Sequence, residues 1–430
     1  MLKLHELHSS VSDPALDTMN FLNEVAWRYP EAISFAAGRP YGEFFDSELV
    51  FTYLRAYLDD LATRGRSWRE VRDHVYQYGP TAGHIRQVIA DWLRQEEDID
   101  VPPESIVVTA GAQEAMLLTL RALIRDRDDV LLAATPCYVG IIGAARLLEA
   151  PLTPVEEREG RLVMDDLVAT IAAERSRGRR PRLLYLVPDH ANPSGGTMPI
   201  EDRRALLDLA AEHDFLIMED SPYRLVSEGR QVPTLKSLDR GRRVVHLGSF
   251  SKTVFPGARV GFAVADQPVA TGTGTGLLAE HLTKIKSMVT VNTSSLGQAA
   301  VAGAIMTAGG LLSKLNAQGA AHYGGTMRSV LEHLDRWLPA DRRAALGVSW
   351  NAPRGGFFLS MTVPFRTDEA ALVRSAQEFG VIWTPMSYFY PDGGGERAIR
   401  LSTSYLTPEE ITEGTARLAR FIEAEGRDAR

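Results

Sequence analysis

Short apolar runs alternate with amphipathic helical patterns through the middle of this 430-residue chain. Patterns of helical period occupy 112–124 and 201–213. Six runs have the length and composition of strands: 107–111, 130–134, 182–188, 215–220, 244–250 and 259–265. Continuous apolar strands separated by helices are typical of a mostly parallel sheet covered by helices on both faces, so we expect an α/β fold.

Polar side chains stand at or just beyond the carboxyl ends of these runs. They are Asn192, Asp220, Ser249 and Lys252. In open parallel sheets, ligands bind at this edge, so these four side chains are candidates for a common functional site.

The pattern changes after about residue 266. A long helical region reaches about residue 338, and three strand-like runs follow, with a helix between the first two: 355–363, 379–385 and 397–406. We therefore expect an N-terminal arm and first helix (1–60), a large domain (61–305) and a smaller α+β domain (306–430). The first forty residues lack enough apolar positions for a core of their own, so the smaller domain is expected to include this arm.

Composition narrows the class of protein. The net charge is −8 and no basic face or block is evident, so we expect no nucleic-acid partner. The single cysteine, Cys137, excludes a disulfide framework, and the histidines lack ligand spacing, so we expect no metal. The N-terminus has no apolar signal core, and the apolar stretch 130–148 is interrupted by Pro136 and Arg146. A cytoplasmic protein without a membrane span is the expectation.

Lys252 lies in FSKTVFPGARVG, directly after an apolar run. A lysine at a strand end commonly keeps its ammonium group in solvent. The neighbours Phe250, Val254 and Phe255 suggest instead a partly desolvated amine with a lowered pKa. Such an amine is suited to Schiff-base formation with a carbonyl, and pyridoxal 5′-phosphate (PLP) is the main cofactor that offers one.

A PLP site makes further demands that can be checked in the sequence. The pyridine nitrogen needs a carboxylate at the end of a buried strand, and Asp220 stands at such a position. The phosphate needs the start of a helix with small residues, hydroxyl groups and an arginine. Candidates for the phosphate are Gly111, Ala112, Gln113, Ser249, Ser251 and Arg259; Tyr138 could cover the ring, and Asn192 and Tyr223 could hold its oxygen.

Each candidate also has an ordinary structural interpretation. Asp220 could cap a helix before Pro222, and Gly111 could serve only as a turn. Tyr138 could belong to the core, and Asn192-Pro193 could be a plain turn signal. The occurrence of all of them in this order and spacing favours the cofactor site.

With these motifs, the chain resembles the fold-type I PLP-dependent enzymes of the class I/II aminotransferase group over nearly its whole length. The resemblance is carried by YGP (78–80), TAGAQEA (109–115), the Pro136–Tyr138 turn, ANPSG (191–195), EDSPY (219–223), GSFSKTVFPGARVG (248–261), GGFFL (355–359) and AIRLS (398–402). It implies transfer of an amino group between an amino acid and a 2-oxo acid. It also implies a homodimer with active sites at the subunit interface.

The resemblance implies a role for each matching position. Lys252 would form the Schiff base and move a proton between the substrate Cα and the cofactor C4′, while Asp220 would pair with the pyridinium nitrogen. Tyr223 and Asn192 would hold the ring oxygen, and Tyr138 would stack on the ring. The phosphate would be held by Ala112, Gln113, Ser249, Ser251 and Arg259, and by Tyr78 of the neighbouring subunit. Arg400 would clamp the substrate α-carboxylate. Gly38, Arg39 and Asn192 would line the substrate pocket.

Three residues depart from the family pattern: Arg39, His190 and Arg224. They could bind a polar or acidic substrate group, or they could be surface or supporting residues. They put the reaction type in doubt. The alternative to amino-group transfer is another reaction on the same cofactor: elimination, replacement, carbon–carbon bond formation or oxidation. The opening segment (7–46) resembles aminotransferases that make hydroxyphenylglycines in glycopeptide-antibiotic pathways, which favours transamination in specialised-metabolite biosynthesis.

Two further features bear on nucleotide and DNA binding. GTGTG (272–276) does not fit the dinucleotide-binding G-x-G-x-x-G pattern, and we expect a flexible connection there. Some transcription regulators carry an aminotransferase-like domain behind a DNA-binding domain. The family match begins by about residue 33, so we do not expect such an arrangement here.

Overall fold

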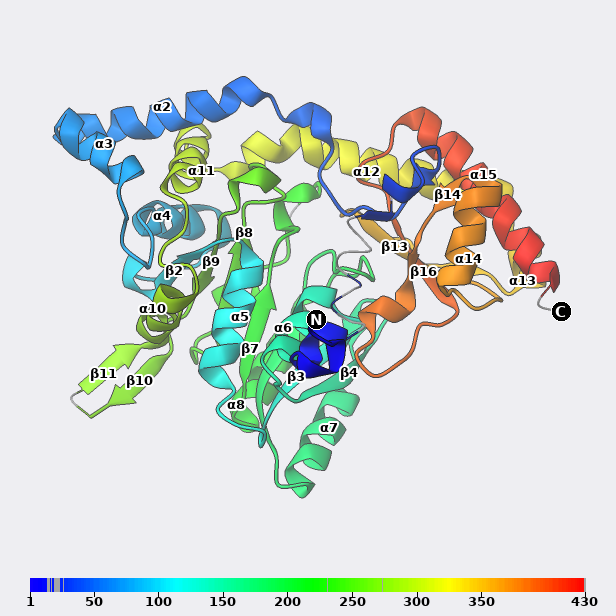
Figure 1. Cartoon of the computed structure of the whole chain (residues 1–430), viewed down its shortest axis with the longest axis horizontal. Coiled ribbons are helices and arrows are strands. Elements are labelled where there is room, and N and C mark those ends of the chain that lie inside the picture. Colours follow the sequence, from blue (N-terminus) through cyan, green and yellow to red (C-terminus); the bar gives the residue numbers. More distant parts are fainter. Residues whose placement is uncertain are drawn as a thin grey trace.

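The computed structural model describes residues 1–428 except 14–15, 17, 19–23, 26, 230 and 273. An eight-stranded sheet forms its centre, in the order β2-β9-β8-β7-β6-β3-β4-β5 (Figure 1). The strands are β2 (Ile106–Thr109), β3 (Asp129–Thr135), β4 (Leu152–Arg158), β5 (Arg161–Leu162), β6 (Arg180–Leu186), β7 (Leu216–Asp220), β8 (Val244–Ser249) and β9 (Gly261–Val264).

The sheet is mostly parallel. β4, β3, β6, β7 and β8 run parallel to one another, whereas β9 is antiparallel to both β8 and β2, and β5 is antiparallel to β4. All seven residues of β3 are buried, as expected for a central strand covered on both faces. The predicted α/β class is thus confirmed, and the six predicted strands are all present.

Helices cover both faces of this sheet. One face packs against α5 (Ala112–Leu123), α6 (Val139–Leu147) and α10 (Leu278–Val289). The other face packs against α4 (Arg86–Glu97) and α11 (Ser295–Thr307) near β2 and β9, and against α7 (Met164–Ser176) and α8 (Ile200–Glu212) near β3 and β6. Two shorter helices add to these layers: α3 (Trp68–Tyr76) contributes Val71 to the core near β2 and β9, and α9 (Leu235–Leu238) contributes Leu235 to the core near β3 and β6.

The C-terminal part forms the expected α+β domain. Its antiparallel sheet has the order β12-β13-β16-β15, with β12 (Ser349–Trp350), β13 (Phe358–Thr362), β15 (Thr384–Pro385) and β16 (Ala398–Ser402). The helices are α12 (Leu312–Trp337), α13 (Ala340–Leu346), α14 (Glu369–Arg374) and α15 (Pro408–Asp428). Figure 1 shows α12 spanning from the central sheet region to this domain.

The N-terminal segment divides between the two domains. β1 (Ile33–Ser34) pairs in parallel with β14 (Val381–Ile382), and Val25 and Phe35 are buried in the smaller domain's core. In contrast, α2 (Ser47–Thr63) packs on α11, where a Cβ on Gly303 would lie only 1.8 Å from the Tyr53 carbonyl oxygen. The expected first helix falls largely outside the described residues, and the expected domain limits stay predictions.

Two elements differ from expectation. β4 was not predicted because Pro154 and four charged residues of VEEREG obscure its pattern. The stretch 272–276, where a flexible connection was expected, lies instead in the hairpin formed by β10 (Pro268–Thr271) and β11 (Gly274–Leu277). In the described part of the chain no single helix has the length and apolar character to cross a membrane; only the bent pair α11 and α12 meets those criteria jointly.

Candidate active site

A cavity of about 320 Å³ opens at the carboxyl ends of the central strands. It lies where the sequence predicted a site, because β7 ends at Asp220 and β8 ends at Ser249. Nearly all the predicted site residues line it: Gly38, Arg39, Ala112, Gln113, Tyr138, Asn192, Asp220, Tyr223, Ser249, Ser251, Lys252, Arg259 and Arg400.

Lys252 projects into this cavity from the turn that follows β8. Phe250, which precedes the turn, is buried against Trp92 and Phe262 and fixes its start. The lysine Nζ donates a hydrogen bond to the Gly38 carbonyl oxygen at 2.9 Å. Burial, together with the positive charges of Arg259 and Arg400, lowers the pKa of the Lys252 amine to about 8. A substantial fraction of this amine is therefore neutral and nucleophilic near pH 8.

The two carboxylate oxygens of Asp220 differ in their hydrogen bonding. Its Oδ2 accepts a hydrogen bond from the Tyr185 hydroxyl at 2.8 Å. Its Oδ1 is buried and has no hydrogen-bond partner among the described residues. Burial raises the pKa of the Asp220 carboxyl to about 7. An unpaired buried carboxylate oxygen is costly, so this atom indicates a place for a cationic or N–H donor.

The start of α5 and the turn after β8 form one end of the cavity. Gly111 precedes α5 with a positive φ of 86°, and a Cβ there would lie 2.5 Å from Arg259 Nη2. Arg259 Nη1 donates to the Ser251 hydroxyl at 3.3 Å. A helix N-terminus, hydroxyl groups and a guanidinium together make a suitable environment for a phosphate.

Tyr138, Asn192 and Tyr223 lie on the remaining walls. Tyr138 directly precedes α6, and Asn192 follows β6. Burial raises the pKa of both tyrosines, that of Tyr138 to about 12 and that of Tyr223 further, so both hydroxyls stay protonated at neutral pH. Gly38 also lines the cavity. Only glycine fits there, because a Cβ at this position would lie 2.5 Å from the Phe358 ring.

Arg400 is a buried cation in β16. Its Nη1 donates to Asn192 Oδ1 at 2.8 Å, and its Nη2 donates to the Ala36 carbonyl oxygen. The guanidinium lies between the rings of Phe358 and Phe389, at 4.6 and 4.9 Å from their centroids. Its buried Nε has no hydrogen-bond partner among the described residues. A buried guanidinium in this state is prepared for an anion in the cavity.

The three residues that depart from the family pattern lie in different places in the structure. Arg39 lines the cavity and stacks over the Tyr405 ring at 4.3 Å. His190 is buried and adopts a positive φ of 50°, and it does not line the cavity. Arg224 lies behind the cavity in a buried ion-pair network, with Glu97 at 2.7 Å and Asp189 at 2.9 Å.

We expect the change Arg224→Met to destabilise the fold by about 3–5 kcal/mol, because Glu97 would lose the cation that balances its buried charge. The Michaelis constants of the folded fraction should not change. Chemical denaturation combined with steady-state kinetics measures both. The exposed Arg69→Met, which removes a loose pair to Asp73, serves as control with a change below about 0.5 kcal/mol. A raised substrate KM at unchanged stability would place Arg224 in substrate binding instead.

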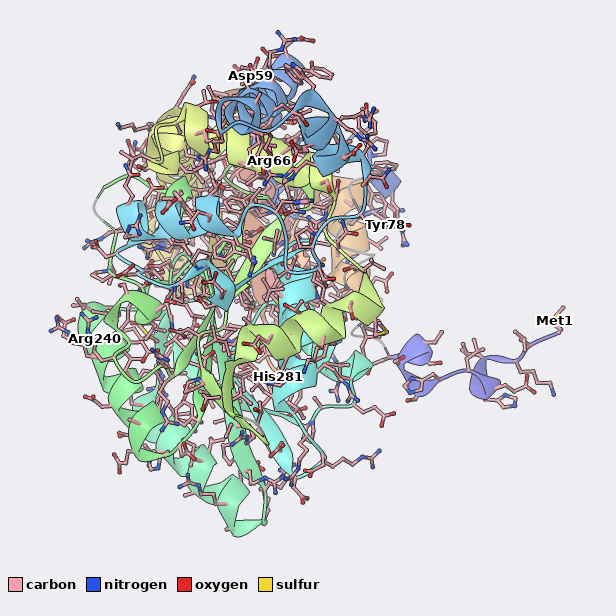
Figure 2. All side chains as sticks on the ribbon, turned by 90° about the vertical axis from the view of Figure 1, so that its left-hand side faces the viewer. Met1, Asp59, Arg66, Tyr78, Arg240 and His281 are labelled. Atoms are coloured by element: carbon pink, nitrogen blue, oxygen red, sulfur yellow. The ribbon has the colours of Figure 1, made fainter. Side chains whose placement is uncertain are left out.

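Tyr78 is the one predicted cofactor residue far from these groups. It is 86% exposed, and Figure 2 shows it at the molecular surface. It is absent from the lining of the cavity in its own chain.

Three residues at or behind the site were not predicted from the sequence: Tyr185, Phe358 and Phe389. The GGFFL motif held a signal for Phe358, whereas Tyr185 is visible only once the register of β6 and β7 is known.

These features fit PLP. The free Asp220 Oδ1 suits the ring N–H of the cofactor. The absence of a side chain at Gly111 allows the Arg259 guanidinium to lie against the start of α5, where the phosphate would bind. Lys252 stands in the same cavity with an amine of lowered pKa, and Arg400 can receive a substrate carboxylate.

Comparison with known proteins agrees with this chemistry. The family described as aminotransferase class I and II matches residues 62–418. The chain is 46% identical over 424 residues to the (S)-3,5-dihydroxyphenylglycine transaminase of Amycolatopsis orientalis, covering 98% of this chain and 95% of that protein.

Solved structures are also similar over nearly the whole chain. The α-aminoadipate aminotransferase LysN of Thermus thermophilus, complexed with N-(5′-phosphopyridoxyl)-L-leucine, has a TM-score of 0.80 and 30% identity, covering 98% of this chain and 99% of LysN. The kynurenine aminotransferase of Pyrococcus horikoshii, in complex with PMP, has a TM-score of 0.80 and 28% identity, covering 94% of each chain. The chain belongs to the aminotransferase class I and II family and is a PLP-dependent enzyme that moves an amino group between an amino acid and a 2-oxo acid.

Proposed function

We propose that the amino-acid substrate is an arylglycine with phenolic hydroxyl groups, of the kind named in the Amycolatopsis transaminase. The 46% identity over 98% of the chain carries this proposal. The site supports it, because the small residues Ala36, Ala37 and Gly38 leave room for a rigid ring close to Lys252. Arg39 lies at the same wall and offers donors to a phenolic oxygen.

We further propose the following division of roles within the cavity. Bound PLP supplies a carbonyl that takes the amino group and a ring that withdraws electrons from the substrate Cα. Lys252 holds the cofactor and then carries the proton at the substrate Cα, because its amine has a lowered pKa. Asp220 keeps the ring nitrogen protonated through its free Oδ1. Asn192 and Tyr223 hold the ring oxygen, and Tyr138 covers the ring face.

Two ends of the cavity fix the orientation of the reactants. The start of α5, Ser249, Ser251 and Arg259 hold the phosphate. Arg400 holds the substrate carboxylate by two parallel hydrogen bonds, which suits a planar guanidinium already fixed between two aromatic rings. The substrate Cα is thereby held beside the Lys252 amine.

A substrate series tests the proposed substrate. We expect kcat/KM for (S)-3,5-dihydroxyphenylglycine to exceed that for unsubstituted (S)-phenylglycine by about 10-fold, the effect of one or two hydrogen bonds. Both should exceed leucine and 2-aminoadipate, which fit a different pocket shape. Absorbance of the cofactor during the first half-reaction reports the rates. A preference for leucine or 2-aminoadipate would contradict the proposal.

The active unit is proposed to be a homodimer in which Tyr78 reaches the cofactor phosphate of the neighbouring chain. The large side chains of Tyr76 (80% exposed), Tyr78 (86%) and Met288 (85%) stand free in the single chain, which supports their burial against a second copy.

A mixed dimer tests this arrangement. Tyr78→Ala and Lys252→Ala chains should each be impaired as homodimers. Their 1:1 hybrid should regain one complete site, because Lys252 of one chain meets Tyr78 of the other. We expect about half of the wild-type activity per dimer, measured on tagged hybrids of about twice 47.3 kDa. A hybrid no more active than the Tyr78→Ala homodimer would show that Tyr78 acts elsewhere.

A further inference from the structure

The hydroxyl of Tyr185 reaches Asp220 from the neighbouring strand. β6 and β7 are parallel, and Tyr185 lies opposite Met218, so Tyr185 and Asp220 share a face of the sheet. The hydroxyl donates to Asp220 Oδ2 at 2.8 Å. Tyr185 is 0% exposed and Asp220 is 2% exposed, so water does not compete for this bond.

This bond makes the two carboxylate oxygens of Asp220 unequal. Oδ2 is occupied by the hydroxyl, whereas Oδ1 is without a partner in the described residues. Asp220 lines the cavity and Tyr185 does not. The carboxylate cannot rotate without breaking a buried hydrogen bond to a charged group, so its free oxygen keeps a fixed direction.

Tyr185 also favours the charged form of Asp220. Burial and the negative charge of Asp220 raise the pKa of the Tyr185 hydroxyl well above its usual value, so Tyr185 stays a donor. A hydrogen bond donated to the ionised carboxylate opposes the effect of burial, which by itself favours the neutral acid. A phenylalanine at this position would fill almost the same volume without either effect.

We propose that Tyr185 is a positioning residue for the cofactor ring nitrogen, which it serves by holding Asp220 so that the ionised Oδ1 faces the N–H group. The proposal rests on the placement of PLP given above. It differs from a purely structural role because removal of the hydroxyl should matter only to a cofactor that has a ring nitrogen.

The experiment compares PLP with its 1-deaza analogue, which has a C–H group in place of the ring nitrogen. We expect Tyr185→Phe to raise the Kd of PLP about 10-fold and to change the Kd of the analogue by less than about twofold. Equilibrium binding to the cofactor-free chain measures both values without any turnover. The control Tyr57→Phe, which removes a hydroxyl bonded to His74 Nε2 at 2.9 Å, should change neither. Equal changes for both cofactors, or no change for PLP, would overturn the proposal.

A second comparison guards against loss of the fold. In the Asp220→Asn background the hydroxyl no longer faces a carboxylate, so adding Tyr185→Phe should change the Kd of PLP by less than about twofold. An undiminished effect of Tyr185→Phe in that background would also overturn the proposal. If wild-type protein bound PLP no better than the analogue, the placement of the ring nitrogen at Asp220 would fail instead, and with it the premise of this inference.

Discussion

Replacing Lys252 by alanine should reduce transamination by at least about 10³-fold, because one amine both holds the cofactor and carries the proton at the substrate Cα. Its position supports both tasks, since it lines the cavity with Asp220 and Arg259 and its pKa is lowered to about 8. Single-turnover kinetics with saturating PLP separates the lost proton transfer from weaker cofactor binding. Borohydride treatment followed by peptide mapping should find the cofactor on Lys252 in wild-type protein only.

The exposed lysine of α10 provides the control. Lys284→Ala removes a lysine amine from the surface, away from the cavity, and we expect wild-type rates and wild-type borohydride labelling. Wild-type turnover by Lys252→Ala, or labelling at another lysine, would contradict the assignment of Lys252.

Replacing Arg400 by lysine should lower kcat/KM for the amino acid by about 10²–10³-fold. The guanidinium lies between Phe358 and Phe389, and its Nε is free of partners among the described residues. An ammonium group keeps the charge but cannot form two parallel hydrogen bonds to a carboxylate. Each charge-assisted hydrogen bond contributes roughly 1.5–3 kcal/mol, which accounts for the expected loss.

Two comparisons locate the effect of Arg400. Arg397→Lys, three residues earlier and exposed, should leave kcat/KM unchanged. For an amine substrate that lacks the carboxylate, Arg400→Lys and wild-type protein should differ by less than about threefold. An equal loss for substrates with and without the carboxylate would show that Arg400 supports the fold of the cavity rather than the substrate.

The sequence predicted the site best where a reactive or charged side chain follows a run with the apolar pattern of a buried strand. The apolar runs of β3, β6, β7 and β8 are buried on both faces and therefore stand out, and their carboxyl ends indicated Asp220 and Lys252. Positions in loops were found through motifs, as for Asn192. β4 was missed because a strand near the sheet edge tolerates polar residues and Pro154.

Contacts between distant segments were beyond sequence reasoning. Arg224 is separated from Glu97 by 127 positions, and only the fold shows that its charge is balanced within the protein. Tyr185 reads as an ordinary core residue until β6 is placed beside β7. Arg39 was the departure that did reach the cavity, and its place directly after Gly38 was the one sequence feature that set it apart from His190 and Arg224.

The half-reaction of the purified holoenzyme is the direct test of amino-group transfer at this site. PLP-loaded protein is mixed with (S)-3,5-dihydroxyphenylglycine in the absence of any 2-oxo acid, and the products are quantified by mass spectrometry. Transamination should yield one equivalent of the corresponding 2-oxo acid and one equivalent of pyridoxamine phosphate per chain, with no ammonia or carbon dioxide. Release of ammonia or carbon dioxide with the cofactor recovered as PLP would contradict transamination at this site.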